Sequence, residues 1–255
     1  MTSTGTHTSL PPLLLATDLD GTFAGGADQD RHSLYARLTS RPHCSLCYAT
    51  GRHLESARAL QDVFHLPAPD IFIADVGATV AAGERGRVLD FPDAELLARW
   101  PGTDTITQRL APLDSVLERQ RIPTDRRLSY FIRDGYRLAD ALERTRTVLA
   151  DLDVGVVGSG ETYLDVLPGG VNKGSTLQRV IRWLGADPDS VVVAGDSLND
   201  LALFETGFKG IVVGNAEEPL RDTVGNLDHV YCARQEGAGG VQEGLRHFGY
   251  LDGLR

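Results

Sequence analysis

The sequence predicts an α/β fold, in which helices cover a mostly parallel β-sheet. Short apolar runs alternate with segments whose apolar residues recur at helical spacing, which is the pattern of successive strand and helix units. The runs are apolar throughout, which indicates strands that are buried on both faces of the sheet. The middle of the chain breaks this alternation. We therefore expect a Rossmann-like parallel sheet core that carries an inserted α+β cap domain.

The core is expected in two segments, residues 13–77 and 168–255. Its strands are the short apolar runs bounded by turn residues, at Leu13–Leu19, Cys44–Ala49, Asp70–Ala74, Val191–Ala194 and Gly210–Val213. Its helices are expected at Arg31–Thr39, His53–Phe64, Lys173–Leu184, Leu198–Phe204, Glu217–Thr223 and Gly240–Phe248. Residues 1–12 are polar and small and end in two prolines, so we expect a disordered tail there.

Residues 78–167 are expected to form the cap. This segment predicts two passages from strand to helix, followed by a pair of strands. The strands are expected at Arg87–Phe91, Leu128–Arg133, Val154–Val157 and Tyr163–Leu167, and the helices at Thr103–Arg119 and Leu138–Leu152.

Composition and charge exclude some classes of function. The chain has 255 residues, of which 42% are apolar and 24% charged, as in an ordinary globular protein. A net charge of −10 argues against a general nucleic-acid binder, which needs a basic surface. No apolar run has membrane-spanning length, and the start lacks the basic residues of a signal peptide. We expect a cytoplasmic monomer or homodimer that binds neither membrane nor nucleic acid.

An acidic pair, Asp18 and Asp20, ends the first expected strand and is followed by Gly21. On a continuing strand both carboxylates would face the same side, and the glycine lets the chain turn and bring them into one small volume. One carboxylate can attack phosphorus to form an acyl-phosphate, and the other can exchange protons with the leaving alcohol and with water. Two solvated turn aspartates are the alternative, and the pair alone does not decide between them.

A second acidic cluster follows the strand Val191–Ala194, with Asp196, Asn199 and Asp200 inside one helical turn after Gly195. Asp196 is placed for a metal ion, although it could equally cap a helix. Lys173 lies between the two clusters and is one of two lysines in the chain. Mg²⁺ prefers oxygen ligands and would balance several carboxylates. Together the clusters favour a phosphoryl-transfer site over helix capping.

Four segments together resemble the four signatures of the haloacid dehalogenase superfamily, in the same order and at similar spacing. They are Asp18-Leu19-Asp20-Gly21-Thr22, Tyr48-Ala49-Thr50-Gly51-Arg52, Asn172-Lys173-Gly174 and Gly195-Asp196-Ser197-Leu198-Asn199-Asp200. The resemblance covers residues 13–200 and implies the fold already expected, a parallel-sheet core with an inserted cap. It implies that Mg²⁺ is the cofactor.

The resemblance also implies a role for each matching residue. Asp18 would be the nucleophile and Asp20 the general acid and base. Thr50 and Lys173 would hold the phosphoryl oxygens, with Leu19, Gly51, Arg52 and Asn199 also binding phosphate or substrate. Mg²⁺ would be ligated by Asp18, the Asp20 carbonyl and Asp196, while Asp200 would fix Lys173 or a metal-bound water.

Further resemblance narrows the substrate class. An acid at Asp20 is typical of the phosphatases and mutases of the superfamily rather than its ATPases or dehalogenases. Four segments are similar to sucrose-phosphate phosphatases and their bacterial glycosyl-phosphate relatives: Asp75–Ala78, Leu128–Phe131, Leu164–Pro168 and Glu236–Leu245. The stretch Arg126-Arg127-Leu128 departs from the more lysine-centred plant pattern, so the resemblance implies a sugar phosphate more firmly than sucrose phosphate itself.

The resulting prediction is a Mg²⁺-dependent phosphatase that hydrolyses a sugar or glycoside phosphate through an aspartyl-phosphate. A sugar phosphomutase would use the same residues, and a non-catalytic sugar-phosphate binding protein is the other alternative, although a binder has no need of Asp20. Candidates for contacts with sugar hydroxyls are Gln120, Arg126, Arg127 and Tyr163, although each of them fits a surface or packing position better.

Overall fold

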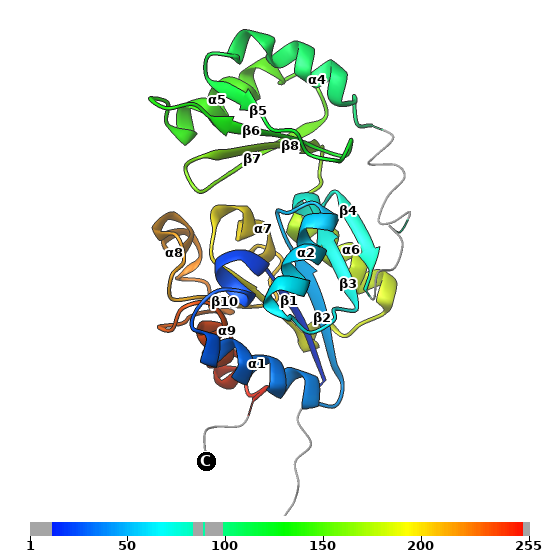
Figure 1. Ribbon diagram of the computed structural model, residues 1–255, viewed down its shortest axis with the longest axis vertical. Helices are drawn as coiled ribbons and strands as arrows, with labels where there is room; N and C mark the ends of the chain where they lie inside the picture. The colour runs from blue at the N-terminus through cyan, green and yellow to red at the C-terminus, as the bar shows by residue number, and fades with distance from the viewer. Residues whose placement is uncertain (1–11, 84–88, 90–98, 252–255) are drawn as a thin grey trace, which may run out of the picture.

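The computed structural model describes residues 12–83, 89 and 99–251, which form a large unit and a small unit (Figure 1). The predicted tail, apart from Pro12, lies outside the described residues. The same holds for the predicted strand Arg87–Phe91, of which only Leu89 is described. No helix in the described ranges has the length and apolar character needed to cross a membrane.

The large unit contains a seven-stranded sheet with the order β11-β10-β9-β1-β2-β3-β4. Its strands are parallel except for β4, which confirms the predicted α/β class. The strands are β1 (Leu13–Thr17), β2 (Cys44–Ala49), β3 (Ile71–Ala74), β4 (Thr79–Ala82), β9 (Val191–Gly195), β10 (Lys209–Val212) and β11 (Val230–Cys232). The chain moves outward from β1 in one direction and from β9 in the other, and ligands bind at the carboxyl ends of strands at such a switch point.

Helices cover both faces of this sheet because its strands are apolar on both sides. Leu13 and Leu15 pack against one set of helices, and Leu14 and Ala16 against the other. The first set is α1 (Asp28–Ser40), α2 (Leu54–Phe64) and α9 (Gly237–His247), and the second is α6 (Lys173–Leu184), α7 (Leu201–Phe204) and α8 (Glu218–Val224). Each fully buried leucine contributes roughly 1.5–3 kcal/mol to this packing.

The small unit is a four-stranded antiparallel sheet in the order β5-β6-β8-β7, with two helices on the face turned away from the large unit (Figure 1). Its elements are α4 (Thr103–Leu110), β5 (Leu117–Arg119), β6 (Leu128–Ile132), α5 (Leu138–Val148), β7 (Val154–Ser159) and β8 (Tyr163–Pro168). Ile106 of α4 and Ala141 of α5 join the sheet in a separate apolar core. The uncovered face of the sheet is the one nearer the large unit.

One predicted helix is wrong in its second half. The helix expected over Thr103–Arg119 ends at Leu110, and a short turn, Ala111–Leu113, leads into strand β5. Pro112 occupies this turn, where its missing N–H cannot extend the helical hydrogen bonding. The apolar residues that suggested one long helical stripe therefore belong to a helix and a strand that share the same core.

A tight turn after β3 explains a strand that the sequence did not predict. Asp75 and Val76 have φ angles of 53° and 57°, and Gly77 has a φ of 110°. The chain thereby reverses, and β4 runs antiparallel to β3 in the large sheet. A Cβ atom on Gly77 would lie 2.5 Å from the Asn172 backbone, so the turn also requires glycine. Residues 79–82, which lie within the range expected for the cap, are thus part of the core sheet.

Helix α6 begins beside the carboxyl ends of β1 and β9. Asn172 caps it through a hydrogen bond of 2.7 Å from the Ser175 N–H to Asn172 Oδ1. The second residue of the helix, Gly174, packs so closely that a Cβ atom there would lie 1.8 Å from the Ala202 carbonyl oxygen. The glycine therefore sets how near α6, and with it Lys173, comes to α7.

We expect Gly174→Ala to lower the free energy of unfolding by about 1–3 kcal/mol, because the added methyl group must displace backbone atoms of Ala202. Helix propensity alone would act in the opposite direction, by up to about 1 kcal/mol. Urea unfolding measures the difference. Arg182→Ala, on the exposed side of the same helix, is the control and should change stability by less than about 0.5 kcal/mol. A neutral or stabilising Gly174→Ala would contradict the close packing.

Candidate active site

A buried ammonium group links the two acidic clusters. Lys173 Nζ donates a hydrogen bond of 2.8 Å to Asp18 Oδ1 and one of 2.6 Å to Asp200 Oδ1. Lys173 and Asp200 are fully buried, and Asp18 is 5% exposed. Asp18 follows β1, Asp200 lies in the turn after β9, and Lys173 opens α6. Three segments that are far apart in the sequence therefore meet at one nitrogen atom.

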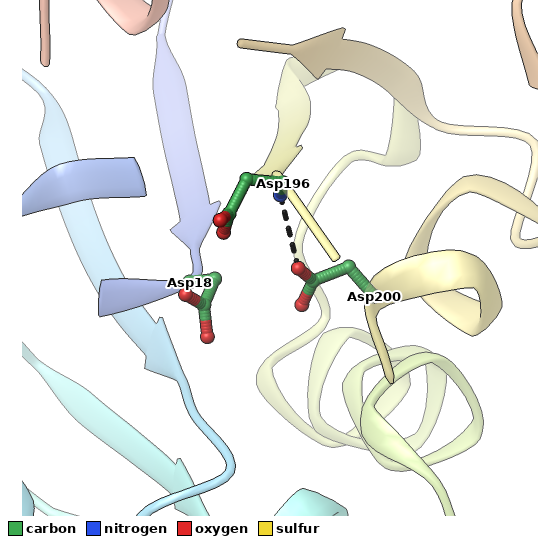
Figure 2. A group of neighbouring side chains, drawn as sticks. All are labelled: Asp18, Asp196 and Asp200. Carbon is green, nitrogen blue, oxygen red and sulfur yellow. Dashed lines mark hydrogen bonds between the residues drawn. The ribbon is translucent and has the colours of Figure 1, made fainter. Parts of the chain in front are cut away.

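Asp196 completes an acidic cluster with Asp18 and Asp200 (Figure 2). The Thr22 hydroxyl donates to Asp196 Oδ1 at 2.7 Å, and Asp200 Oδ2 accepts from the Asp196 N–H at 3.1 Å. One oxygen from each of the three carboxylates lies within 4.8 Å of the others. Gly21, with a φ of 71°, is required here, because a Cβ atom would lie 2.2 Å from Asp196 Oδ2.

Burial and crowding raise the pKa values of Asp18 and Asp196. Burial raises the pKa of Asp18 well above its usual value, against the attraction of Lys173. Burial, together with repulsion from Asp200, raises the pKa of Asp196 to about 7. Burial by itself would lower the pKa of Lys173, but the attraction of Asp18 and Asp200 more than offsets this and leaves it above its usual value. The raised pKa of Lys173 favours its charged form, while the raised pKa values of Asp18 and Asp196 disfavour their ionised forms.

The cluster fits a divalent cation. Three carboxylates face a single ammonium group, which leaves two negative charges without a partner when all are ionised. Mg²⁺ takes oxygen ligands and carries the charge that would balance them. Beside the cluster, Asn199 Oδ1 is buried and has no hydrogen-bond partner among the described residues, so a polar ligand fits there as well.

Asp20 has a different partner from Asp18. The Arg52 guanidinium donates two hydrogen bonds to the Asp20 carboxylate, from Nε to Oδ2 at 2.6 Å and from Nη2 to Oδ1 at 2.7 Å. The Asp20 side chain is 53% exposed, whereas Asp18 is buried with Lys173. The hydrogen bonds from Arg52 to Asp20 raise the pKa of the guanidinium further above its usual value. Both acids line one pocket, in which Asp18 is buried and Asp20 is exposed.

The remaining predicted residues occupy different positions around the pocket. Thr50 is fully buried after β2, and its hydroxyl oxygen accepts from the Arg52 N–H at 3.1 Å. Gly51 and Asn199 line the pocket directly. The Leu19 side chain is fully buried in the apolar core, so only its backbone could serve a phosphate.

The pocket has a volume of about 630 Å³ and is lined by both units. The large unit contributes Asp18, Asp20 and Asp196, among others, and the small unit contributes Gln120, Arg127, Ser129, Tyr163 and Asp165. Arg126 instead reaches the Ala78 carbonyl at 3.4 Å and is not among the lining residues. Sequence reasoning missed Ser129 and Asp165. The signal for Asp165 was a lone carboxylate in the apolar strand β8, which is buried from Leu164 to Pro168.

Glu217 also lines the pocket and had no recognisable sequence signal. Its Oε1 atom accepts from the Gly160 N–H at 3.0 Å, in the turn between β7 and β8. Its Oε2 atom accepts from the Leu198 N–H at 2.9 Å, in the turn that carries Asn199 and Asp200. One carboxylate therefore fastens the small unit to the acidic cluster.

Comparisons with known proteins agree with this geometry. A family model described as sucrose-6F-phosphate phosphohydrolase matches residues 11–249. Mannosylfructose-phosphate phosphatase of Agrobacterium fabrum is 30% identical over 94% of this chain and 98% of its own length. Glucosylglycerol-phosphate synthase of Pseudomonas anguilliseptica is 41% identical, and the match covers 94% of this chain but only 31% of that protein.

A solved structure is similar over nearly the whole chain. The sucrose-phosphatase of Synechocystis sp., in complex with sucrose and phosphate, is 30% identical and superposes with a TM-score of 0.85. The match covers 95% of this chain and 100% of that one. The arrangement of core and small unit is thus shared with an enzyme structure that contains a disaccharide and phosphate.

The raised pKa of Asp196 makes a prediction about pH. The pKa of Asp196 is about 7 in the folded protein and 3.8 ordinarily. The folded state therefore binds the Asp196 proton more tightly than the unfolded state does, and the free energy of unfolding falls as the pH rises from about 4 to 7. In EDTA, we expect Asp196→Asn to gain roughly 2 kcal/mol of stability relative to wild type between pH 5 and pH 8. Urea unfolding of both proteins at the two pH values measures this. An unchanged difference would show that Asp196 ionises freely in the folded state.

Proposed function

The chain belongs to the sucrose-6F-phosphate phosphohydrolase family and is a sugar phosphatase, and from this we propose that it hydrolyses a glycosyl-sugar or glycosyl-polyol phosphate through a covalent intermediate on Asp18. The observation that carries the proposal is Asp18, which is bound by the buried Lys173 and lines a pocket to which the small unit contributes polar side chains. The sequence alone left a non-catalytic binding protein as an alternative, and membership in a phosphohydrolase family argues against it.

Asp18 supplies the nucleophile. Lys173 binds its Oδ1 atom, and no hydrogen bond within the described ranges holds Oδ2. Attack by a carboxylate oxygen forms the bond from Asp18 to phosphorus while the bond from phosphorus to the sugar oxygen breaks. Water then attacks the same phosphorus and frees Asp18 and phosphate. Lys173 holds the carboxylate in place and balances charge on the phosphoryl group through both steps, with Thr50, Gly51 and Asn199 as further phosphate contacts.

Asp20 exchanges the protons. It gives one to the departing sugar oxygen and takes one from the attacking water. Both of its oxygens accept hydrogen bonds from Arg52. The guanidinium must therefore release at least one oxygen before that oxygen can reach the leaving group. The released Arg52 is then free to bind the phosphoryl group or the sugar.

Asp18 and Asp196, with the Asp20 carbonyl, are the proposed ligands of Mg²⁺. When bound, the ion would supply the positive charge that a phosphate and several carboxylates need in one small volume. Lys173 cannot supply that charge alone, because Asp18 and Asp200 already share it.

The small unit is the proposed cap that selects the substrate. Residues at the floor of the pocket meet only phosphate and metal, whereas Gln120, Ser129 and Asp165 offer hydrogen bonds to hydroxyl groups above it. A volume of about 630 Å³ suits a ligand of two small rings or of a ring and a polyol. The names of the relatives, which include a mannosylfructose and a glucosylglycerol phosphate, agree with that class.

A panel of phosphate esters tests the substrate class. We expect the highest kcat/KM on a disaccharide phosphate or a glycosyl-glycerol phosphate, because only these reach both the floor and the small unit. Phosphate release should be compared with hexose phosphates, nucleotides and phosphoserine. Asp18→Asn is the background control and should retain less than about a thousandth of the wild-type rate, as expected for a missing nucleophile. A nucleotide as the best substrate would contradict the proposed class.

Metal removal gives an independent prediction. EDTA should abolish turnover and Mg²⁺ should restore it, whereas Ca²⁺ should inhibit because its larger and looser coordination misplaces the nucleophile. In the absence of substrate, Mg²⁺ should also raise the melting temperature of wild type more than that of Asp196→Asn. Full turnover in metal-free buffer would rule out the proposed cofactor.

A further inference from the structure

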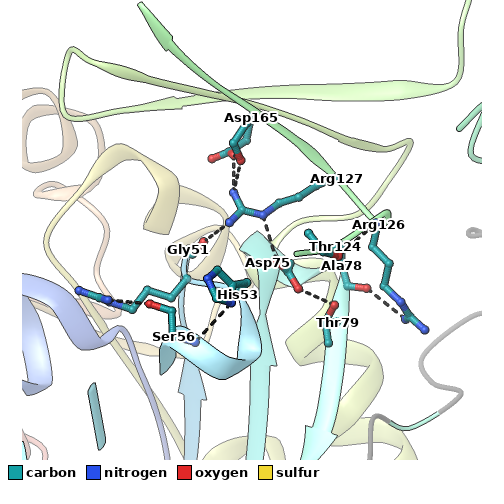
Figure 3. A network of polar contacts seen from close by, with 12 residues as sticks. Gly51, His53, Ser56, Asp75, Ala78, Thr79, Thr124, Arg126, Arg127 and Asp165 are labelled. Atoms are coloured by element: carbon teal, nitrogen blue, oxygen red, sulfur yellow. Dashed lines mark hydrogen bonds and ion pairs between the residues drawn. The ribbon is translucent and has the colours of Figure 1, made fainter. Parts of the chain in front are cut away.

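Arg127 is buried where the small unit meets the large unit, and its guanidinium reaches both (Figure 3). It lies just before β6 and is 6% exposed. In the small unit, Nη1 donates to Ser129 Oγ and to Asp165 Oδ1. In the large unit, Nε donates to Asp75 Oδ1 at 3.1 Å, and Nη2 donates to the Gly51 carbonyl oxygen at 2.8 Å. The planar fork of arginine suits four acceptors at fixed angles, which lysine cannot match.

The contact to Gly51 completes a set of restraints on the Thr50–Arg52 loop. The Thr50 carbonyl accepts from the Val76 N–H at 3.1 Å, and the Arg52 carbonyl accepts from the Asp75 N–H at 2.8 Å. The carbonyl between them, that of Gly51, accepts from Arg127. Each of the three consecutive carbonyl groups therefore has a donor from outside the loop, and the middle donor comes from the small unit.

The backbone that supplies the other two donors is strained. Asp75 and Val76 both have positive φ angles, which is a genuine departure for the β-branched Val76. Such conformations cost on the order of 1–3 kcal/mol each and persist only where surrounding contacts impose them. Here Arg127 binds Asp75 Oδ1, and the Thr79 hydroxyl donates to Asp75 Oδ2 at 2.7 Å. Contacts to the Asp75 carboxylate thus hold the strained Asp75–Val76 turn, whose N–H groups bind the Thr50–Arg52 loop.

The loop matters because its last residue, Arg52, is the partner of Asp20. We propose that Arg127 is a positioning residue for the reaction: it fixes the Thr50–Arg52 loop from the small unit and thereby sets where Arg52 presents and releases Asp20. This inference rests on the proposed function, since it assigns Arg127 an effect on proton transfer by Asp20. Arg127 itself touches neither Asp18 nor Asp20 in any contact of the structure.

A purely structural ion pair makes a different prediction. If Arg127 only balanced the buried charges of Asp75 and Asp165, its replacement would lower stability and reduce every activity by one factor. If it positions Asp20 through Arg52, the loss should depend on the leaving group. A sugar oxygen must be protonated as it departs, whereas p-nitrophenolate is stable as an anion and leaves without help from an acid.

The test compares Arg127→Lys with wild type on the best sugar phosphate and on p-nitrophenyl phosphate. The quantity is kcat/KM, which reports the steps up to the departure of the leaving group and excludes the later attack of water. We expect the ratio of the sugar-phosphate value to the p-nitrophenyl phosphate value to fall at least ten-fold. Arg133→Lys is the matched control, because the Arg133 side chain is exposed and its hydrogen bonds among the described residues go to Asp114 and Glu118 of the small unit. Its ratio should stay at the wild-type value.

A second measurement does not depend on turnover. The side-chain Nε–H of Arg52, labelled with ¹⁵N, should be protected from exchange with water by its bond to Asp20 in wild type and in Arg133→Lys. We expect faster exchange in Arg127→Lys. If thermal unfolding shows that Arg127→Lys is not folded, the double variant Arg127→Gln, Asp165→Asn removes one charge of each sign. It is compared by Arg52 exchange alone, because Asp165 lines the pocket.

Equal losses on both substrates with unchanged Arg52 exchange would overturn the positioning role and leave a structural ion pair. No loss on either substrate would overturn it as well. A different result would contradict the proposed function itself: wild-type protein that releases no phosphate from any sugar phosphate.

Discussion

The structure of the site depends on one ammonium group buried between two carboxylates. Lys173 joins the end of β1 to the turn after β9, and both bonds are shorter than 3 Å. Burying such a set is costly, and buried ion pairs are weak sources of stability because the desolvation penalty offsets much of the attraction. Two neighbouring glycines leave the space that this buried set of charges requires. Gly174 lets α6 approach α7, and a Cβ atom on Gly195 would lie 2.6 Å from Asp200 Cβ. Function, rather than stability, explains why this arrangement is kept.

The sequence predicted the parts of this arrangement that strand ends dictate. Asp18, Asp196 and Asp200 meet as expected, because parallel strands present their carboxyl ends at one edge of the sheet, and Lys173 reaches them from the start of α6. The periodic segments likewise predicted the alternation of strands and helices in the core. The short, alanine-rich strand β4 was not predicted, and the helix expected over Thr103–Arg119 was predicted too long because Pro112 interrupts its apolar stripe.

Contacts between residues that are far apart in the sequence could not be predicted from local sequence patterns. Nothing near Asp20 in the sequence identifies Arg52 as its partner, because the pairing depends on how the turn at Gly21 directs the side chain. Arg127 fits a surface position by its surroundings in the sequence, yet it is buried because Asp75, Asp165 and the Gly51 carbonyl converge on it from other segments. Glu217 is a further case, since its two acceptors face donors from both units. Under the proposed function, the large unit would carry out the phosphate chemistry, while the small unit lines the pocket and binds the Thr50–Arg52 loop through Arg127.

The central claim is that Asp18, held by Lys173, forms the covalent bond to phosphorus. Wild-type protein should be mixed with ³²P-labelled sugar phosphate, quenched in acid within milliseconds and digested, so that the labelled peptide can be identified. The account predicts label on the peptide that contains Asp18, at up to one phosphoryl group per chain, and none in Asp18→Asn. Rapid release of phosphate without protein-bound label, or label on a peptide that lacks Asp18, would contradict it.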